Sequence, residues 1–421
     1  MKKFRWVWDI PISWILMFIY LPILWVIALV QYVRNFTFKK NEKYWYKGKI
    51  RYPSRDYRDV LLDLYHQSPV FKDNDINLYV CRVPFDQKPN GMNHNTDHSA
   101  LRNGLYLSVM KKIGSVNQDM VLGQNLHYDP CLDEFHRGYY IKKDGIIDRQ
   151  SFNPVSGDCV VGHCFAYVHQ IEGMELEMAS IAHHCIKNQG LKTAGVVSSV
   201  ANFLPGIQGK PSETPVTVGA QHITYLSVVR CGMDAVKRLS PEMRRFRGIP
   251  SYGYFAWHYY KRLFIYGAFL SVMFPTVGVW WRRSYNNDVI CMMAAYVLHK
   301  LSSNRLEKLI YGISGLYVWS LSWPWLNGFF SGLLRDMLKK FPSEKYMYRC
   351  LLWAIDLADV RYGSIGPKEK STQWPIDPKR LEFDEFAPER SHEDQYSDPS
   401  KIQYIYRDNV GQLAALVWSK I

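Results

Sequence analysis

Three apolar segments, each headed by an aspartate, constrain the fold of this 421-residue chain more than any other feature. Asp158 precedes CVVGHCFAYVH, Asp288 precedes VICMMAAYVLHKL, and Asp408-Asn409 precedes VGQLAALVWSK. Asp and Asn are preferred at helix starts, because the side-chain oxygen accepts an otherwise unpaired backbone N–H of the first turn. The segments themselves are apolar nearly all round and contain few charges for a solvent face. We therefore expect three helices that are buried on every side.

Most of the remaining chain also has helical patterning, with apolar residues three or four positions apart. We predict ten helices, at residues 98–113, 157–170, 175–188, 219–239, 257–279, 287–302, 306–319, 328–340, 344–360 and 409–420. Strand signals are few: one covers residues 77–83, and Lys143-Asp144-Gly145 indicates a hairpin turn within residues 138–149. The predicted fold is therefore mainly α with one small β-hairpin. Fully buried helices that alternate with amphipathic ones suggest two concentric layers, with the inner helices starting at a common rim.

This pattern resembles the six-hairpin (α/α)6 toroid superfamily, which is rich in glycoside hydrolases and related carbohydrate-active enzymes. The resemblance is architectural: it rests on helix count, chain length and the residues Gly157-Asp158, Asn287-Asp288 and Asp408-Asn409, and it covers about residues 95–421. In such proteins the inner-helix starts line a funnel that carries acidic residues. The resemblance implies that Asp158, Asp288 and Asp408 lie in such a funnel, and that the hairpin at 138–149 enters it.

Cleavage of a glycosidic bond needs two carboxyl groups, one protonated as the acid and one ionised as the base or nucleophile. Asp158 and Asp288 are the predicted acid/base pair, with Asp408 as the third catalytic candidate. The candidate substrate-binding residues are Arg149, His163, Tyr139, Tyr140 and Trp374. Helix capping and core packing also account for each of these residues taken singly.

Residues 10–30 contain no charge and are dense in Ile, Leu, Val, Trp and Phe, which matches the ~20 residues that a helix needs to cross a bilayer. We predict a single-pass transmembrane anchor at residues 1–33, a basic connecting segment at 34–94 and a helical domain at 95–421. Lys and Arg residues after the span favour a cytoplasmic C-terminal side. Two later uncharged runs, 263–281 and 309–334, contain Pro, Gly or polar residues that suit helices within a domain better.

The net charge and the types of residue present limit the partners and ligands that this chain is expected to bind. The formal net charge is +14, and the basic cluster at residues 34–51 indicates anionic lipid as a partner, whereas no nucleic-acid-binding signature is present. The eight cysteines are scattered, without CxxC spacing, and are predicted to be free core thiols. His94 with His98, and His183-His184, were weighed as metal ligands, but their spacing is poor and we expect neither a metal nor a cofactor.

Two functions are therefore expected. The first is a membrane-anchored, glycoside-hydrolase-like enzyme acting on a polysaccharide or glycoconjugate. The alternative is a non-enzymatic, membrane-associated scaffold or envelope protein that binds anionic lipid or partner proteins. The oligomeric state stays open.

Overall fold

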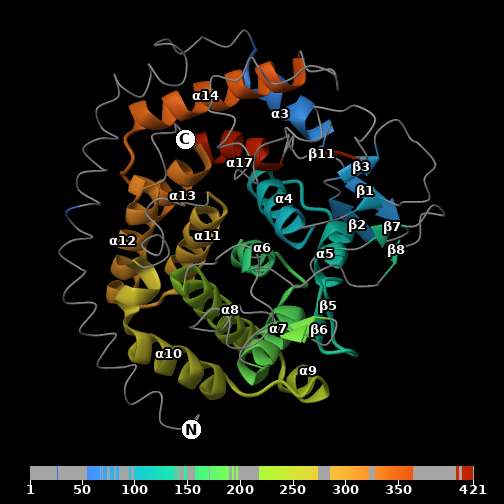
Figure 1. Ribbon diagram of the computed structural model, residues 1–421, viewed down its shortest axis with the longest axis vertical. Helices are drawn as coiled ribbons and strands as arrows, with labels where there is room; N and C mark the ends of the chain where they lie inside the picture. The colour runs from blue at the N-terminus through green and yellow to red at the C-terminus, as the bar shows by residue number, and fades with distance from the viewer. Residues whose placement is uncertain are drawn as a thin grey trace. The chain divides into compact units, whose positions relative to one another are not determined.

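The computed structural model describes residues 26, 55–66, 68, 70–73, 76–79, 82–84, 94–95, 99–136, 138, 140–141, 147–148, 157–169, 171–188, 192–193, 196–197, 218–273, 285–321, 328–363, 404–406 and 410–420. In these residues the chain is mainly helical, as predicted (Figure 1). Each of the ten predicted helices overlaps a helix of the structure. Three further helices, α3 (Tyr57–His66), α5 (Gln118–Asn125) and α9 (Pro241–Phe246), were not predicted.

The chain forms two compact units. Unit 1 comprises Met1–Phe36, Asn125–His136 and Asn153–Trp323, and unit 2 comprises Thr37–Gln124, Arg137–Phe152 and Pro324–Ile421. Each unit is therefore assembled from segments that are distant in the sequence.

Unit 1 places three buried helices against partly exposed ones. The buried helices are α6 (Gly157–Val168), α8 (Val218–Arg238) and α11 (Tyr285–Leu301). The partly exposed helices are α7 (Glu175–Asn188), α10 (Tyr252–Met273) and α12 (Arg305–Leu321), and Figure 1 shows α10 and α12 at the outside of this unit. Two small hairpins complete it: β5 (Tyr128–Asp129) with β6 (Glu134–Phe135), and β9 (Lys192–Thr193) with β10 (Val196–Val197).

Unit 2 repeats this alternation. Its buried helices are α4 (Ser99–Ile113), α13 (Gly328–Leu338) and α17 (Val410–Ser419), and its partly exposed helices are α3 and α14 (Glu344–Gly363). The expectation that the segments after Asp158, Asp288 and Asp408 are buried all round is confirmed, because residues 159–167, 289–298 and most of 410–418 are inaccessible to solvent.

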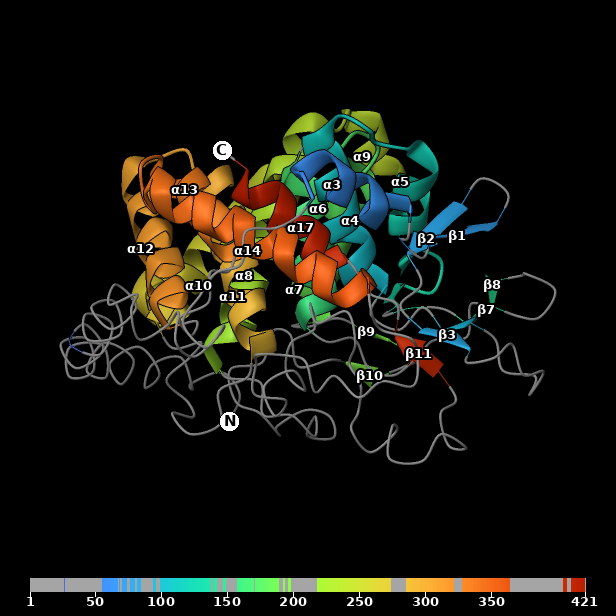
Figure 2. The same cartoon turned by 90° about the horizontal axis from the view of Figure 1, so that it is seen from above.

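Unit 2 also holds the main sheet, with strand order β11-β3-β4-β7-β8. The strands are short: β3 (Arg82–Pro84), β4 (His94–Asn95), β7 (Tyr140–Ile141), β8 (Ile147–Asp148) and β11 (Tyr404–Tyr406). All neighbours are antiparallel, and Figure 2 shows β11 beside β3. The predicted hairpin at 138–149 is observed as β7–β8. The predicted strand at 77–83 is divided between two strands: its first part belongs to β2 (Ile76–Tyr79), which pairs with β1 (Val70–Asp73), and its last part belongs to β3.

Local capping explains where several exposed helices begin. Asn304 Oδ1 accepts a hydrogen bond from the Glu307 N–H at 2.7 Å, Ser240 Oγ from the Met243 N–H at 3.2 Å, and Ser343 Oγ from the Tyr346 N–H at 3.3 Å. Each bond satisfies one of the free donors of a first helical turn.

The prediction of a transmembrane helix and a single-pass membrane location is corrected by the structure. In the part of the chain that it describes, no helix is both long enough and apolar enough to cross a bilayer. The predicted span at 10–30 lies outside the described residues apart from Val26. The run at 309–334 belongs to two separate helices, since α12 ends at Leu321 and α13 begins at Gly328.

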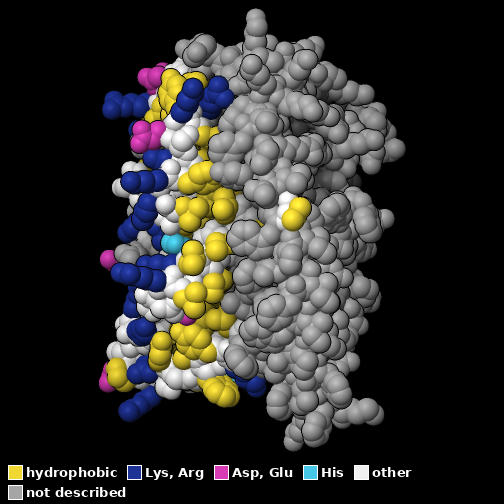
Figure 3. Space-filling model, turned by 90° about the vertical axis from the view of Figure 1, so that its left-hand side faces the viewer, with side chains coloured by type: hydrophobic (Ala, Val, Ile, Leu, Met, Phe, Trp, Pro, Cys, Tyr) yellow, Lys and Arg dark blue, Asp and Glu magenta, His cyan; other side chains and the backbone are white. Residues whose placement is uncertain are grey.

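Most of the described cysteines lie in the core, and Lys and Arg side chains lie at the surface. Six of the seven described cysteines are buried and all seven are free, which agrees with the prediction of core thiols; the exception to burial is Cys131. At the surface, Lys and Arg side chains line the described part of one face with few Asp or Glu side chains among them (Figure 3).

Candidate functional site

The predicted acid/base pair lies on two buried helices that contact each other in unit 1. Asp158 is the second residue of α6 and Asp288 is the fourth residue of α11, so each belongs to the first turn of its helix. The helices meet through Phe165 and Tyr296, whose ring centroids are 5.5 Å apart. Phe165 is seven residues after Asp158, and Tyr296 is eight residues after Asp288. The contact therefore lies about two helical turns after each aspartate along its own helix.

Two contacts show how α8, a neighbouring buried helix, is oriented relative to α6. A Cβ at Gly157, the first residue of α6, would lie 3.6 Å from Thr224 Oγ1 near the start of α8. At the other end, Tyr167 donates a hydrogen bond to Asp234 Oδ2 at 2.8 Å. Because the later contact on α6 is also the later contact on α8, the two helices run parallel.

Four of the predicted site residues lie in parts of the chain that the structure does not describe. Asp408 follows β11 by two residues and Arg149 follows β8 directly, but both, like Tyr139 and Trp374, lie outside the described residues. Tyr140 is in β7, where it pairs with Asn95 and Asp148.

Three strands of the sheet in unit 2 run in the same direction. Because every neighbouring pair in the sheet is antiparallel, β11, β4 and β8 point the same way. In the sequence β4 leads into α4, β8 leads into α6 and β11 leads into α17, and all three of these helices are buried. The carboxyl ends of β4, β8 and β11 therefore lie at the same end of the sheet in unit 2.

His163 does not have the surroundings predicted for a sugar contact. It lies in the middle of α6 with 0% of its surface exposed, and its ring contacts Phe135 at a centroid distance of 6.1 Å. Burial, together with the neighbouring His127, lowers the pKa of His163 to about 3. The ring is therefore neutral and lies in the core, so we no longer assign it to substrate binding.

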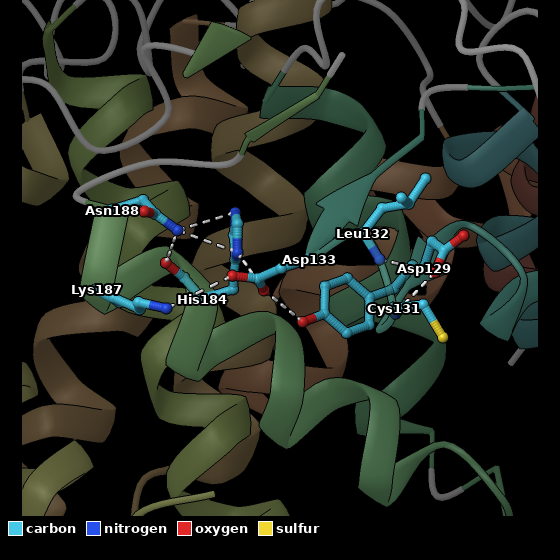
Figure 4. Close-up of polar contacts among 8 residues, drawn as sticks. Asp129, Cys131, Leu132, Asp133, His184, Lys187 and Asn188 are labelled. Carbon is cyan, nitrogen blue, oxygen red and sulfur yellow. Dashed lines mark hydrogen bonds and ion pairs between the residues drawn. The ribbon is translucent and has the colours of Figure 1, made fainter. Parts of the chain in front are cut away.

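A polar cluster that the sequence did not indicate joins the β5–β6 hairpin to α7 (Figure 4). It is formed by Tyr128, Asp133, His184 and Lys187. Asp133 Oδ1 lies 2.6 Å from His184 Nδ1 and accepts a hydrogen bond from the Tyr128 hydroxyl at 2.8 Å. Its second oxygen is 3.9 Å from Lys187 Nζ. Asp133 also has a positive φ of 52°, a conformation that Asp and Asn tolerate better than most residues.

The pKa values of Asp133 and Tyr128 shift in opposite directions, although burial acts to raise both. Partial burial would raise the pKa of Asp133, but the Tyr128 hydrogen bond and the nearby His184 and Lys187 outweigh it and hold that pKa below its ordinary value. Burial, and then the bond to Asp133, raises the pKa of Tyr128.

The cluster binds the hairpin to α7 and is not an open acid/base site. The His184 side chain is 0% exposed and is also contacted by Asn188, so it cannot reach a substrate. Asp129 Oδ1 accepts hydrogen bonds from the N–H groups of Cys131 and Leu132, which shapes the hairpin tip. The sequence drew attention to His184, but nothing in it pointed to Asp133, which is 51 residues earlier.

No group of three His, Cys, Asp or Glu side chains that could hold a metal ion occurs among the described residues. Of the metal candidates weighed from the sequence, His184 instead faces Asp133, while the His183 ring contacts Tyr254 at a centroid distance of 5.8 Å. Comparisons of this chain with protein-family models, with curated proteins and with solved structures found no match.

Proposed function

We propose that this protein is a glycoside-hydrolase-like enzyme of the helical-toroid type, which cleaves a polysaccharide or glycoconjugate with Asp158 and Asp288 as its paired carboxyl groups. One carboxylic acid protonates the glycosidic oxygen as the C–O bond breaks. The other carboxylate either activates water or attacks the sugar itself, and water supplies the new hydroxyl group.

The observation that carries this proposal is the contact between α6 and α11. Two largely buried helices, each with an aspartate in its first turn, contact each other through Phe165 and Tyr296. Buried helices alternate with partly exposed ones in both units, and α6 runs parallel to α8, which also supports a toroid-like arrangement.

The proposal is tested with the full chain and a panel of neutral and acidic polysaccharides, by measuring the release of reducing ends. We expect Asp158→Asn and Asp288→Asn each to reduce cleavage by about 10²- to 10⁴-fold, the usual contribution of a general acid or base. Asn has nearly the same size and shape as Asp and removes only the carboxyl group, so stability should change little.

Asp59→Asn and Asp119→Asn are matched controls, because these aspartates lie in the first turns of α3 and α5, outside the proposed site. Both variants should cleave like the parent chain. Full activity of Asp158→Asn or Asp288→Asn, or no cleavage of any polysaccharide by the parent chain, would contradict the proposal.

A further inference from the structure

Helices α10 and α12 expose large apolar side chains on the surface of unit 1. In α10, Trp257 is 65% exposed and Tyr260 is 44% exposed. In α12, Leu306 is 66% exposed and Leu309 is 58% exposed. Both pairs have a spacing of three residues, which puts the two members of a pair on the same side of a helix.

Contacts between the two helices bring these pairs to the same level. Tyr259, next to Tyr260, shares a hydrogen bond of 2.7 Å with Tyr311, which is two residues after Leu309. Tyr260 also interacts with Glu307, the neighbour of Leu306. The exposed residues of α10 and α12 are therefore within one helical turn of residues that touch across the helix pair.

The charge around these side chains is positive. Lys261, Arg305 and Lys308 are exposed. The only acidic residue in 252–262 and 303–310 is Glu307, which is 5% exposed and faces Arg230 of α8 at 3.7 Å. Because the one carboxylate points into the core beside an arginine, the surface keeps only cations. Figure 3 shows the side of the molecule that carries α10 and α12, with hydrophobic side chains beside Lys and Arg.

We infer that the α10–α12 face, formed by Trp257, Tyr260, Lys261, Leu306, Lys308 and Leu309, docks on the surface of an anionic lipid bilayer. Lys and Arg are attracted to anionic headgroups, and the apolar side chains enter the boundary between headgroups and acyl chains. Trp and Tyr are enriched at that depth. This contact is peripheral and requires no membrane-spanning helix.

The aliphatic residues favour lipid over nucleic acid. Single-stranded nucleic acid is bound by cations together with aromatic rings on which bases stack. Leu306 and Leu309 offer no such ring, although they are among the most exposed apolar residues of unit 1. Insertion into a bilayer uses leucine as readily as tryptophan.

The inference is tested by co-sedimentation of the full chain with vesicles of phosphatidylcholine alone or with about 30% phosphatidylglycerol. Two double variants are compared with the parent chain, K261E/K308E and L306S/L309S. We expect each to lower affinity for the anionic vesicles by at least about tenfold, and the charge-reversed variant to lose most of its preference for anionic over neutral vesicles. Every variant keeps the whole chain, so lipid affinity of other segments is common to all.

Matched controls lie outside this face. K339E/K340E reverses two exposed lysines that directly follow α13, and L122S/L132S removes two leucines that are 49% and 58% exposed. Both controls should bind like the parent chain, and unchanged circular dichroism and melting of all variants exclude unfolding. Affinity of both test variants within about twofold of the parent chain overturns the inference. The inference is also overturned if the two test variants lose affinity for a single-stranded oligonucleotide but not for the vesicles.

Discussion

At the scale of single residues, Asp133 shows how a polar contact between distant segments holds a local structure. Its carboxylate accepts from Tyr128 in the same hairpin and faces His184 on α7. The side chain is 39% exposed, so water weakens these interactions, and we expect their contribution to be at the low end of the range for charged hydrogen bonds.

Asp133→Asn tests this contribution, because Asn tolerates the positive φ and removes only the charge. We expect the free energy of unfolding at pH 7 to fall by about 1 kcal/mol, measured by urea titration. The folded state holds the pKa of Asp133 below its ordinary value, so the carboxylate stabilises the fold above the unfolded pKa. That stabilisation is lost as the pH falls through the folded pKa, and the difference between parent and variant should shrink below a pH of about 4.

Asp129→Asn is the control for the hairpin tip, since the Asn oxygen can still accept from the Cys131 and Leu132 N–H groups. It should leave stability nearly unchanged. An equal loss for Asp133→Asn at pH 7 and pH 3 would show that charge is not the source of its effect.

Glu307 and Arg230 form a charged pair in the core, and removal of one partner leaves the other charge unpaired. We expect Glu307→Leu to lower the free energy of unfolding by about 3 kcal/mol. The double variant Arg230→Met with Glu307→Leu should lose less, because it buries no unpaired charge. A double-mutant cycle measured by urea titration checks this expectation, and a double variant that is less stable than Glu307→Leu contradicts it.

At the scale of elements, glycine allows buried helices of unit 2 to approach closely. A Cβ at Gly332 in α13 would lie 2.2 Å from the backbone oxygen of Trp418 in α17, and one at Gly328 would lie 2.4 Å from that of Ala415. Backbone atoms cannot move aside as a flexible side chain can. The two glycines of the buried helix α13 therefore have a packing reason.

Gly332→Ala should force α13 and α17 apart and lower stability by about 1–3 kcal/mol, the usual cost of overpacking. Thermal melting followed by circular dichroism measures this loss. Gly253→Ala is the matched control, because the nearest atom to its Cβ would be Ser251 Oγ at 3.9 Å, and its melting temperature should stay the same or rise slightly. Equal melting of the Gly332→Ala variant and the parent chain would contradict the close approach.

At the scale of the whole molecule, the helices were predictable and their burial partly so. Local periodicity gave ten helices, since helical spacing and capping depend on residues near one another in the sequence. Nine of them have ends within three residues of those observed, whereas α10 begins five residues before and ends six residues before its predicted bounds. The short helices α3, α5 and α9 were not predicted. They have only ten, eight and six residues, and segments this short show little helical periodicity. Apolar content alone led to the membrane-spanning prediction, which the described helices do not support.

The candidate site was only partly accessible to prediction. The sequence identified aspartates at the starts of buried helices, and α6 and α11 do contact each other. It also assigned His163 to substrate, although helical spacing cannot distinguish a side chain that lines a site from one that lies in the core.

The sequence by itself determined the mainly helical class, the positions of the long helices and the total charge, because these depend on composition and on contacts within a few residues. Only the tertiary structure decided that Asp133 meets His184, that His163 is fully buried, and that Trp257 and Leu306 are exposed beside lysines while Glu307 faces Arg230. These outcomes depend on which helix covers which face, and packing between residues tens of positions apart sets that arrangement.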